Sequence, residues 1–127
     1  MAKTWKEMVA EAKQQVTLLS VDEAKRLIES RKDVLVVDVR EKDEYLRGHI
    51  KGALLIPRGV LEMTVDQTNP DCDPRFRDPS TTIIVHCAAG GRSAMAALAL
   101  KTMGFRNASS LEGGYNAWEK ASYPVEK

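Results

Sequence analysis

The chain has 127 residues, which is enough for one folded domain with a substantial core but not for two. It contains 19 basic and 18 acidic residues, so its net charge of +1 gives no reason to expect nucleic acid or a membrane surface as a partner. No apolar stretch is long enough to span a membrane, and the first residues lack the apolar core of a signal peptide. Two cysteines form no disulfide framework, so a cytoplasmic location is expected.

Residues 1–15 predict an amphipathic helix that forms an N-terminal helical extension. Trp5, Met8, Val9 and Ala12 recur at the spacing of one helix face. An isolated helix of this length is marginal in water, so we expect it to pack on the rest of the chain. A partner-binding appendage is the alternative. The remaining residues, 16–127, form the main domain.

The main domain alternates short apolar strands with helices. Strands are expected at Val16–Leu19, Val34–Val37, Ala53–Ile56, Ile83–Val85 and Ala108–Leu111. The main helices are expected after the capping box of Ser20 and Glu23, and at Glu41–Arg47, Arg92–Met103 and Tyr115–Lys120. This order predicts an α/β fold in which a central five-stranded parallel sheet has helices on both faces.

Two segments are expected to lie outside this regular framework. Residues 64–80 are rich in Asp and Pro and predict a long surface loop, and residues 124–127 predict a tail. Cys72 lies in the loop between Asp71 and Asp73, whose negative charges disfavour a thiolate. We therefore expect Cys72 to be a poor nucleophile.

Segment 83–93 predicts a buried strand, a tight loop that opens on Cys87, and the first turn of a helix. Gly90 and Gly91 allow the backbone to curl so that the loop amides point inward at the cysteine. These amides, the helix N-terminus and Arg92 all favour negative charge at one point. Cys87 is therefore expected to be a thiolate nucleophile. The alternative, a buried cysteine that acts only as a small apolar group, explains neither the paired glycines nor the arginine.

Polar residues near the ends of the expected strands complete the candidate site. Asp38 and Arg40 follow the second strand, at the sheet edge where open α/β folds place their ligand sites. We expect Asp38 to support the site, and Arg40 either to support it or to contact an anion. His49 is expected to fix a turn rather than act as a base for Cys87, because the loop amides already stabilise a thiolate. His86 precedes Cys87 in a strand, so its side chain should face away from it.

Four stretches of the sequence together resemble the rhodanese-like domains, the single-domain sulfurtransferases. They are Asp38–Glu41 with Tyr45, Gly48–Ala53, His86–Ser93, and Leu111–Tyr115 with Trp118. The resemblance extends from about Leu19 to Pro124. It implies a rhodanese-like fold and transfer of a sulfane sulfur from thiosulfate or a similar anionic donor. The acceptor would be cyanide or a cellular thiol, the intermediate would be a Cys87 persulfide, and no metal or organic cofactor is implied.

The resemblance also implies roles for the residues around Cys87. The transferred sulfur would be held by the amides of Ala88, Ala89, Gly90, Gly91, Arg92 and Ser93. Members that are specific for thiosulfate tend to have a cation within this loop, whereas the loop here is neutral and small. Arg92, Arg40 and Arg58 are the candidate replacements for that cation. Asp38 and Arg40 would brace the wall of the site.

Two other functions remain open from the sequence. The domain could carry persulfide between partner proteins, with a protein as donor or acceptor in place of a small molecule. A cysteine-dependent phosphatase is the second alternative, since these enzymes also use a loop from cysteine to arginine. Four residues separate Cys87 from Arg92, one fewer than in the phosphatase signature, which favours sulfur transfer.

Overall fold

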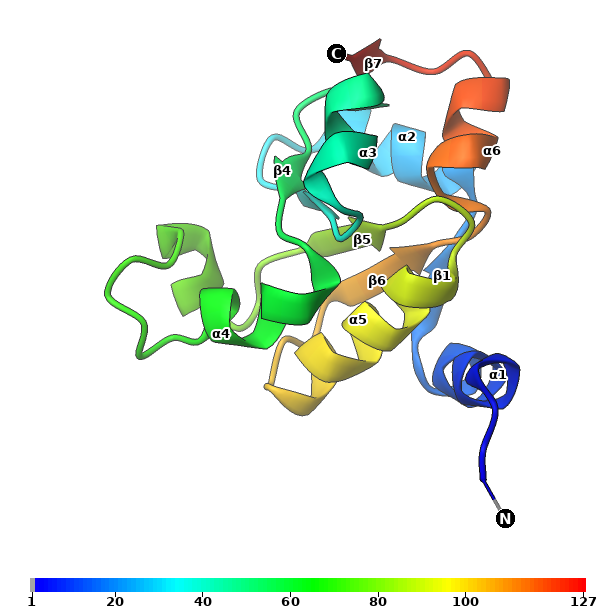
Figure 1. Ribbon diagram of the computed structural model, residues 1–127. Coiled ribbons are helices and arrows are strands. Elements are labelled where there is room, and N and C mark those ends of the chain that lie inside the picture. Colours follow the sequence, from blue (N-terminus) through cyan, green and yellow to red (C-terminus); the bar gives the residue numbers. More distant parts are fainter. Residues whose placement is uncertain (1) are drawn as a thin grey trace.

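A five-stranded parallel sheet forms the centre of the computed structural model, which describes residues 2–127 (Figure 1). The strands are Thr17–Leu19 (β1), Leu35–Asp38 (β2), Leu54–Leu55 (β4), Ile83–His86 (β5) and Ala108–Leu111 (β6). Their order across the sheet is β1-β6-β5-β2-β4, and every neighbouring pair is parallel. The predicted α/β fold is confirmed, and β5 is the middle strand.

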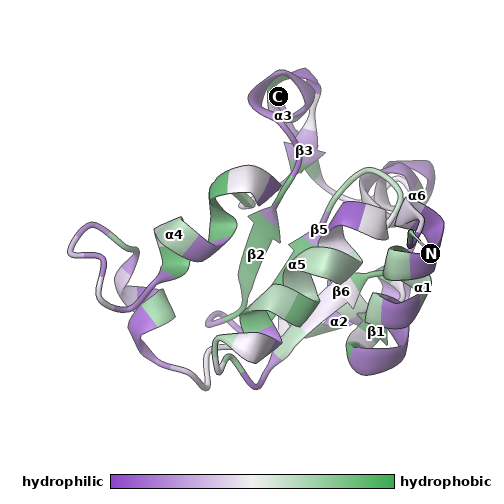
Figure 2. Ribbon diagram, turned by 60° about the horizontal axis from the view of Figure 1, so that its bottom comes forward, coloured by the Kyte–Doolittle hydropathy of each residue, from purple (hydrophilic) through white to green (hydrophobic). Residues whose placement is uncertain are grey.

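Helices cover both faces of the sheet. They are Trp5–Gln15 (α1), Val21–Ser30 (α2), Lys42–Arg47 (α3), Leu61–Val65 (α4), Gly91–Thr102 (α5) and Gly114–Lys120 (α6), with 3₁₀ turns at Arg58–Val60 (η1) and Pro74–Arg77 (η2). Because side chains alternate along a strand, Val37 and Val85 face a core with Leu100 of α5, whereas Val36 faces a core with Trp118 of α6. Strand β2, between β5 and β4, is apolar along most of its length (Figure 2). None of the helices in residues 2–127 is long and apolar enough to cross a membrane.

The N-terminal helix α1 packs beside α5 rather than standing away from the domain (Figure 1). A capping box of Thr4 and Glu7 starts it, and Ala12 is fully buried. Trp5 lies so close to Gly91 that a methyl group at Gly91 would be 3.3 Å from its ring, although 56% of Trp5 stays exposed. Helix α1 therefore contacts the point where the Cys87 loop ends and α5 begins.

Two segments differ from the sequence expectations. The prediction of a tail at residues 124–127 was wrong, because Val125–Glu126 (β7) pairs antiparallel with His49–Ile50 (β3). The Trp118 indole N–H holds this segment by donating to the Pro124 carbonyl at 2.9 Å. Residues 64–80 are also more than a surface loop. Phe76 of η2 is fully buried and packs edge-on against Phe105, with ring centroids 6.0 Å apart.

Candidate active site

Cys87 directly follows β5, at the carboxyl edge of the middle of the sheet. Its Sγ accepts hydrogen bonds from the backbone N–H groups of Gly90 at 3.1 Å and Ser93 at 3.4 Å. The Ser93 hydroxyl lies 3.5 Å from Sγ and is itself 2.8 Å from the Ser110 hydroxyl. Cys87 is only 1% exposed, so these dipoles act on the sulfur with little competition from water. The arrangement favours negative charge on Sγ.

The start of α6 holds the other side of the Cys87 loop. The Tyr115 amide donates to the Cys87 carbonyl at 2.8 Å, and the Asn116 amide donates to the Ala88 carbonyl at 3.0 Å. Because the N–H and C=O of a trans peptide point in opposite directions, the Ala88 and Ala89 amides point away from α6. The close approach requires Gly114, because a Cβ there would lie 2.5 Å from the Cys87 oxygen. Sequence reasoning missed this hydrogen bonding.

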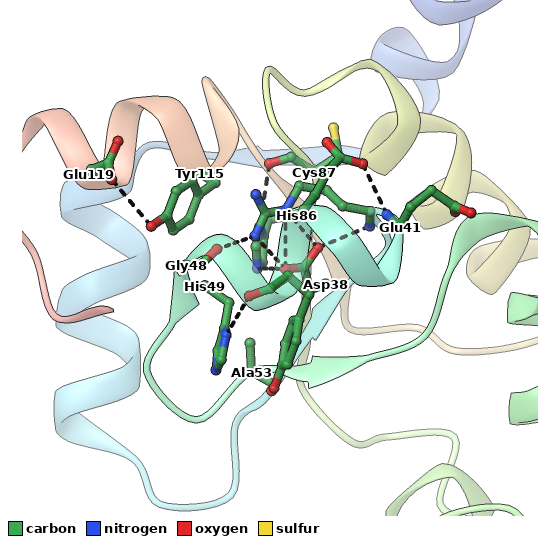
Figure 3. Close-up of polar contacts among 12 residues, drawn as sticks. Asp38, Glu41, Gly48, His49, Ala53, His86, Cys87, Tyr115 and Glu119 are labelled. Atoms are coloured by element: carbon green, nitrogen blue, oxygen red, sulfur yellow. Dashed lines mark hydrogen bonds and ion pairs between the residues drawn. The ribbon is translucent and has the colours of Figure 1, made fainter. Parts of the chain in front are cut away.

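Asp38 and Arg40 form a buried ion pair beside the loop (Figure 3). Arg40 Nη2 lies 2.9 Å from Asp38 Oδ2 and donates to the Gly48 carbonyl at 2.7 Å. The guanidinium also stacks on the Tyr115 ring, 4.4 Å from its centroid. Asp38 is fully buried and Arg40 is 5% exposed. Of the two roles considered for Arg40, the geometry therefore favours support of the site.

His86 belongs to the same buried network as Asp38. Its Nε2 lies 3.6 Å from Asp38 Oδ2, and its Nδ1 lies 3.4 Å from the Cys87 carbonyl oxygen. Within residues 2–127, Nε2 has no hydrogen-bond partner. Burial lowers the pKa of His86 to about 4, although the charge of Asp38 opposes the shift. The ring is therefore neutral at pH 7, and it lies with Asp38 as expected for a residue that faces away from Sγ.

His49 fixes the turn after α3. Its Nδ1 lies 3.0 Å from the Tyr45 carbonyl oxygen, and its ring stacks on the Tyr45 ring with centroids 3.7 Å apart. The Tyr45 hydroxyl in turn donates to the Ala53 carbonyl at 2.8 Å. These contacts support the expected structural role and give His49 no part as a base.

The two remaining candidate cations are paired with carboxylates. Arg92 donates from both Nη atoms to Glu44, at 2.9 and 3.0 Å, and Arg58 lies 2.7 Å from Glu62. The hydrogen bonds from Arg92 lower the pKa of Glu44 to about 2. Sequence reasoning missed Glu44, although it lies within the same short helix as Tyr45, one of the residues that carried the resemblance.

Cys72, the other cysteine, is buried in an apolar cluster that also contains Phe76 and Leu61. Both cysteines are free thiols. Unlike Cys87, the Cys72 sulfur is not among the side chains of residues 2–127 that accept a backbone hydrogen bond. The sulfur that backbone amides surround is that of Cys87.

The fold and the site define an α/β domain in which a buried cysteine at the carboxyl edge of the sheet accepts hydrogen bonds from backbone amides. Residues 20–121 match the model of the rhodanese-like domain, and the chain belongs to this family. It is 30% identical over 120 residues to thiosulfate sulfurtransferase 18 of Arabidopsis thaliana, covering 88% of this chain and 85% of that one. It is 36% identical over 92 residues to thiosulfate sulfurtransferase GlpE of Pseudomonas fluorescens, covering 72% and 75%. These relatives support sulfur transfer as the general class of activity.

A solved structure from Rhodopseudomonas palustris is similar over nearly the whole chain. It superposes with a TM-score of 0.91 at 34% identity, and the match covers 99% of this chain and 96% of that one. That protein is described as one of unknown function and a possible tyrosine phosphatase. The similarity includes the region of α1, which the family model does not match.

Substitution of Gly114 tests how the Cys87 loop is held. Gly114→Ala combines backbone strain of ~1–2 kcal/mol at its φ of +57° with overpacking of ~1–3 kcal/mol against two loop carbonyls. It should lower the free energy of unfolding in urea by about 3 kcal/mol and slow alkylation of Cys87 at neutral pH. Gly52→Ala is the matched control, because its φ is +82° but its Cβ would meet nothing within 4 Å. Equal losses in the two variants would contradict the role given to the α6 contact.

The buried neutral His86 predicts a loss of stability in mild acid. Between pH 6.5 and its folded pKa of about 4, this histidine binds a proton in the unfolded chain but not in the folded one. The free energy of unfolding should therefore fall by about 2 kcal/mol from about pH 6.5 to about pH 5, above the usual range of carboxyl groups. His86→Asn should flatten this slope in urea titrations at each pH. Wild type and His86→Asn both contain His49. A slope that is the same in the two proteins would therefore show that His86 does not cause the loss of stability in acid.

Proposed function

We propose that the protein transfers a sulfane sulfur atom through a persulfide on Cys87. The observation that carries this proposal is the Sγ atom that accepts hydrogen bonds from the Gly90 and Ser93 amides at the end of β5. A thiolate is the nucleophilic form of cysteine, and these donors favour it. The sulfurtransferases among the relatives support the same chemistry.

The proposed reaction is a double displacement. The Cys87 thiolate attacks the outer sulfur of an anionic donor such as thiosulfate, and the sulfur–sulfur bond of the donor breaks. Sulfite leaves with the bonding electrons, and the transferred sulfur is bound to Sγ. A thiophilic acceptor, cyanide or a cellular thiol, then attacks that terminal sulfur and regenerates the thiolate. The reaction uses only sulfur chemistry and needs no cofactor.

The loop would supply the electrostatic stabilisation. The outer sulfur of the persulfide would be held by the amides of Ala88, Ala89, Gly90, Gly91, Arg92 and Ser93. Donors that are fixed before the reaction need not reorganise while charge moves onto the new sulfur. The hydrogen bonds from α6 to the Cys87 and Ala88 carbonyls provide this fixed geometry.

Phosphate-ester hydrolysis is the second candidate, because the similar Rhodopseudomonas palustris protein is described as a possible tyrosine phosphatase. Two observations disfavour it here. The loop from Cys87 to Arg92 is one residue shorter than the phosphatase signature. The Arg92 guanidinium, which would have to bind the phosphoryl oxygens, is paired with Glu44.

Alanine substitution of each cysteine tests the proposed nucleophile. With thiosulfate and cyanide, the protein should release thiocyanate, and Cys87→Ala should abolish this release. Cys72→Ala removes the other sulfur atom, which packs among apolar side chains, and it should leave turnover within about twofold because Cys72 has no place in the proposed reaction. Mass spectrometry after donor alone should show one added sulfur atom on Cys87. Equal loss in both variants would refute this assignment.

An aryl phosphate separates the two candidate reactions. Hydrolysis of p-nitrophenyl phosphate should stay at the level of the Cys87→Ala variant, because a short loop and a paired arginine leave a phosphoryl group without ligands. The measurement is release of nitrophenol from the wild type and the variant under identical conditions. Turnover by the wild type that depends on Cys87 would establish the phosphatase instead.

A further inference from the structure

Each arginine that could attract an anionic donor is already bound to a carboxylate. Arg40 is paired with the buried Asp38, and Arg58 is paired with Glu62. Arg92, at the start of the helix that follows the Cys87 loop, makes two parallel hydrogen bonds to Glu44. Such fork-to-fork pairing is the strongest geometry for a guanidinium and a carboxylate. The charge of each candidate cation is thus compensated locally.

Glu44 is held in position by its own helix. It is the third residue of α3, and its Oε1 also accepts a hydrogen bond from the Glu41 backbone N–H at 3.0 Å. The side chains of Arg92 and Glu44 are 34% and 23% exposed, so water screens the pair less than it would a fully exposed one. The Glu44 carboxylate is therefore already held in position before it binds Arg92, so forming the pair costs little conformational entropy.

Arg92 is close enough to Cys87 for its charge to matter there. It directly precedes Ser93, whose backbone N–H donates to Cys87 Sγ at 3.4 Å, and its hydrogen bonds to Glu44 raise the pKa of the Arg92 guanidinium. Without Glu44, this guanidinium would add one positive charge beside the loop. With Glu44, a small dianion that approaches Cys87 meets a pair whose net charge is zero, so the attraction by Arg92 is lost.

We propose that Glu44 determines the donor class of this site: by neutralising Arg92 it disfavours small dianions such as thiosulfate and favours organic persulfides, R–S–SH. This inference rests on the proposed sulfur transfer at Cys87. In the favoured reaction the Cys87 thiolate attacks the terminal sulfur of R–S–SH, and the bond between the two donor sulfurs breaks. R–S⁻ leaves with the bonding electrons, and Cys87–S–SH forms, so no oxidant or reductant is needed.

Glu44→Gln tests this role, because glutamine keeps the shape of the side chain and still suits the third position of a capping box. Turnover is measured with thiosulfate and with freshly prepared cysteine persulfide, with cyanide as acceptor for both. The variant should lower KM for thiosulfate about three- to five-fold with kcat nearly unchanged, the scale of one partly exposed charge pair. KM for cysteine persulfide should change less than twofold. The gain for thiosulfate should shrink as ionic strength rises.

Two further variants separate this effect from a general change of charge. Asp43→Asn removes one negative charge from the neighbouring position of α3, where the carboxylate forms only an exposed pair with Arg47 at 3.6 Å, and it should leave both KM values nearly unchanged. Arg92→Gln added to Glu44→Gln should cancel the gain. An equal gain in Asp43→Asn, or a gain that survives loss of Arg92, overturns the proposal, as does an equal change for both donors.

The wild-type protein provides a test that does not depend on folding of a variant. Because its Arg92 is neutralised, KM for thiosulfate should depend weakly on salt, and a steep rise with ionic strength overturns the proposal. Cys87→Ala in the same assay distinguishes the two levels of inference. Turnover that depends on Cys87 but does not respond to Glu44→Gln overturns the donor assignment alone, whereas turnover that persists in Cys87→Ala overturns the proposed function.

Discussion

Two hydrogen bonds from the start of α6 set the geometry on which the site depends. They hold the carbonyls of Cys87 and Ala88, while the Gly90 and Ser93 amides further along the loop donate to the Cys87 sulfur. A peptide unit cannot present both its N–H and its C=O on one side, so fixing these carbonyls also fixes the orientation of the Ala88 and Ala89 amides. The surroundings of the Cys87 sulfur are therefore built from backbone groups rather than from a neighbouring base.

The two arginine pairs near the site differ in their physics. Arg40 and Asp38 are buried, and Arg40 also contacts Gly48 and Tyr115, so removal of one member of the pair leaves a charge without compensation inside the protein. Arg92 and Glu44 are partly exposed and connect α5 to α3 at the surface. Loss of either member there costs little stability but changes the field at Cys87. The first pair supports the structure of the site, and the second is the pair that we propose affects the choice of sulfur donor.

The parts of the molecule that sequence reasoning predicted are those specified by local patterns. The β-branched run before Cys87 and the paired glycines after it lie within one short stretch of sequence. Strand β5, the loop and α5 could therefore be predicted from that stretch alone. Two wrong expectations, for the loop at residues 64–80 and for the tail, came from contacts that no local pattern records. Phe76 enters the core from a polar loop, and β7 forms only because β3 offers it an edge.

The residues that were missed in the site share that cause. In the sequence, Glu44 is an ordinary carboxylate in the first turn of α3, and nothing local indicates its partner Arg92, which is 48 positions away. The role of Arg40 could not be decided for the same reason, because Gly48 and Tyr115 come to it only through the folded sheet. Pairs of side chains that are distant in the sequence could therefore not be predicted from one sequence.

The contact between α6 and the Cys87 loop also orders events during synthesis of the chain. Residues 115 and 116, which donate to the loop, are made well after Cys87, and β6 must first join the sheet beside β5 to bring them there. Until that segment has left the ribosome, the Cys87 and Ala88 carbonyls lack these hydrogen-bond donors. The loop around Cys87 therefore reaches its final hydrogen-bonded form only when synthesis of the domain is nearly complete.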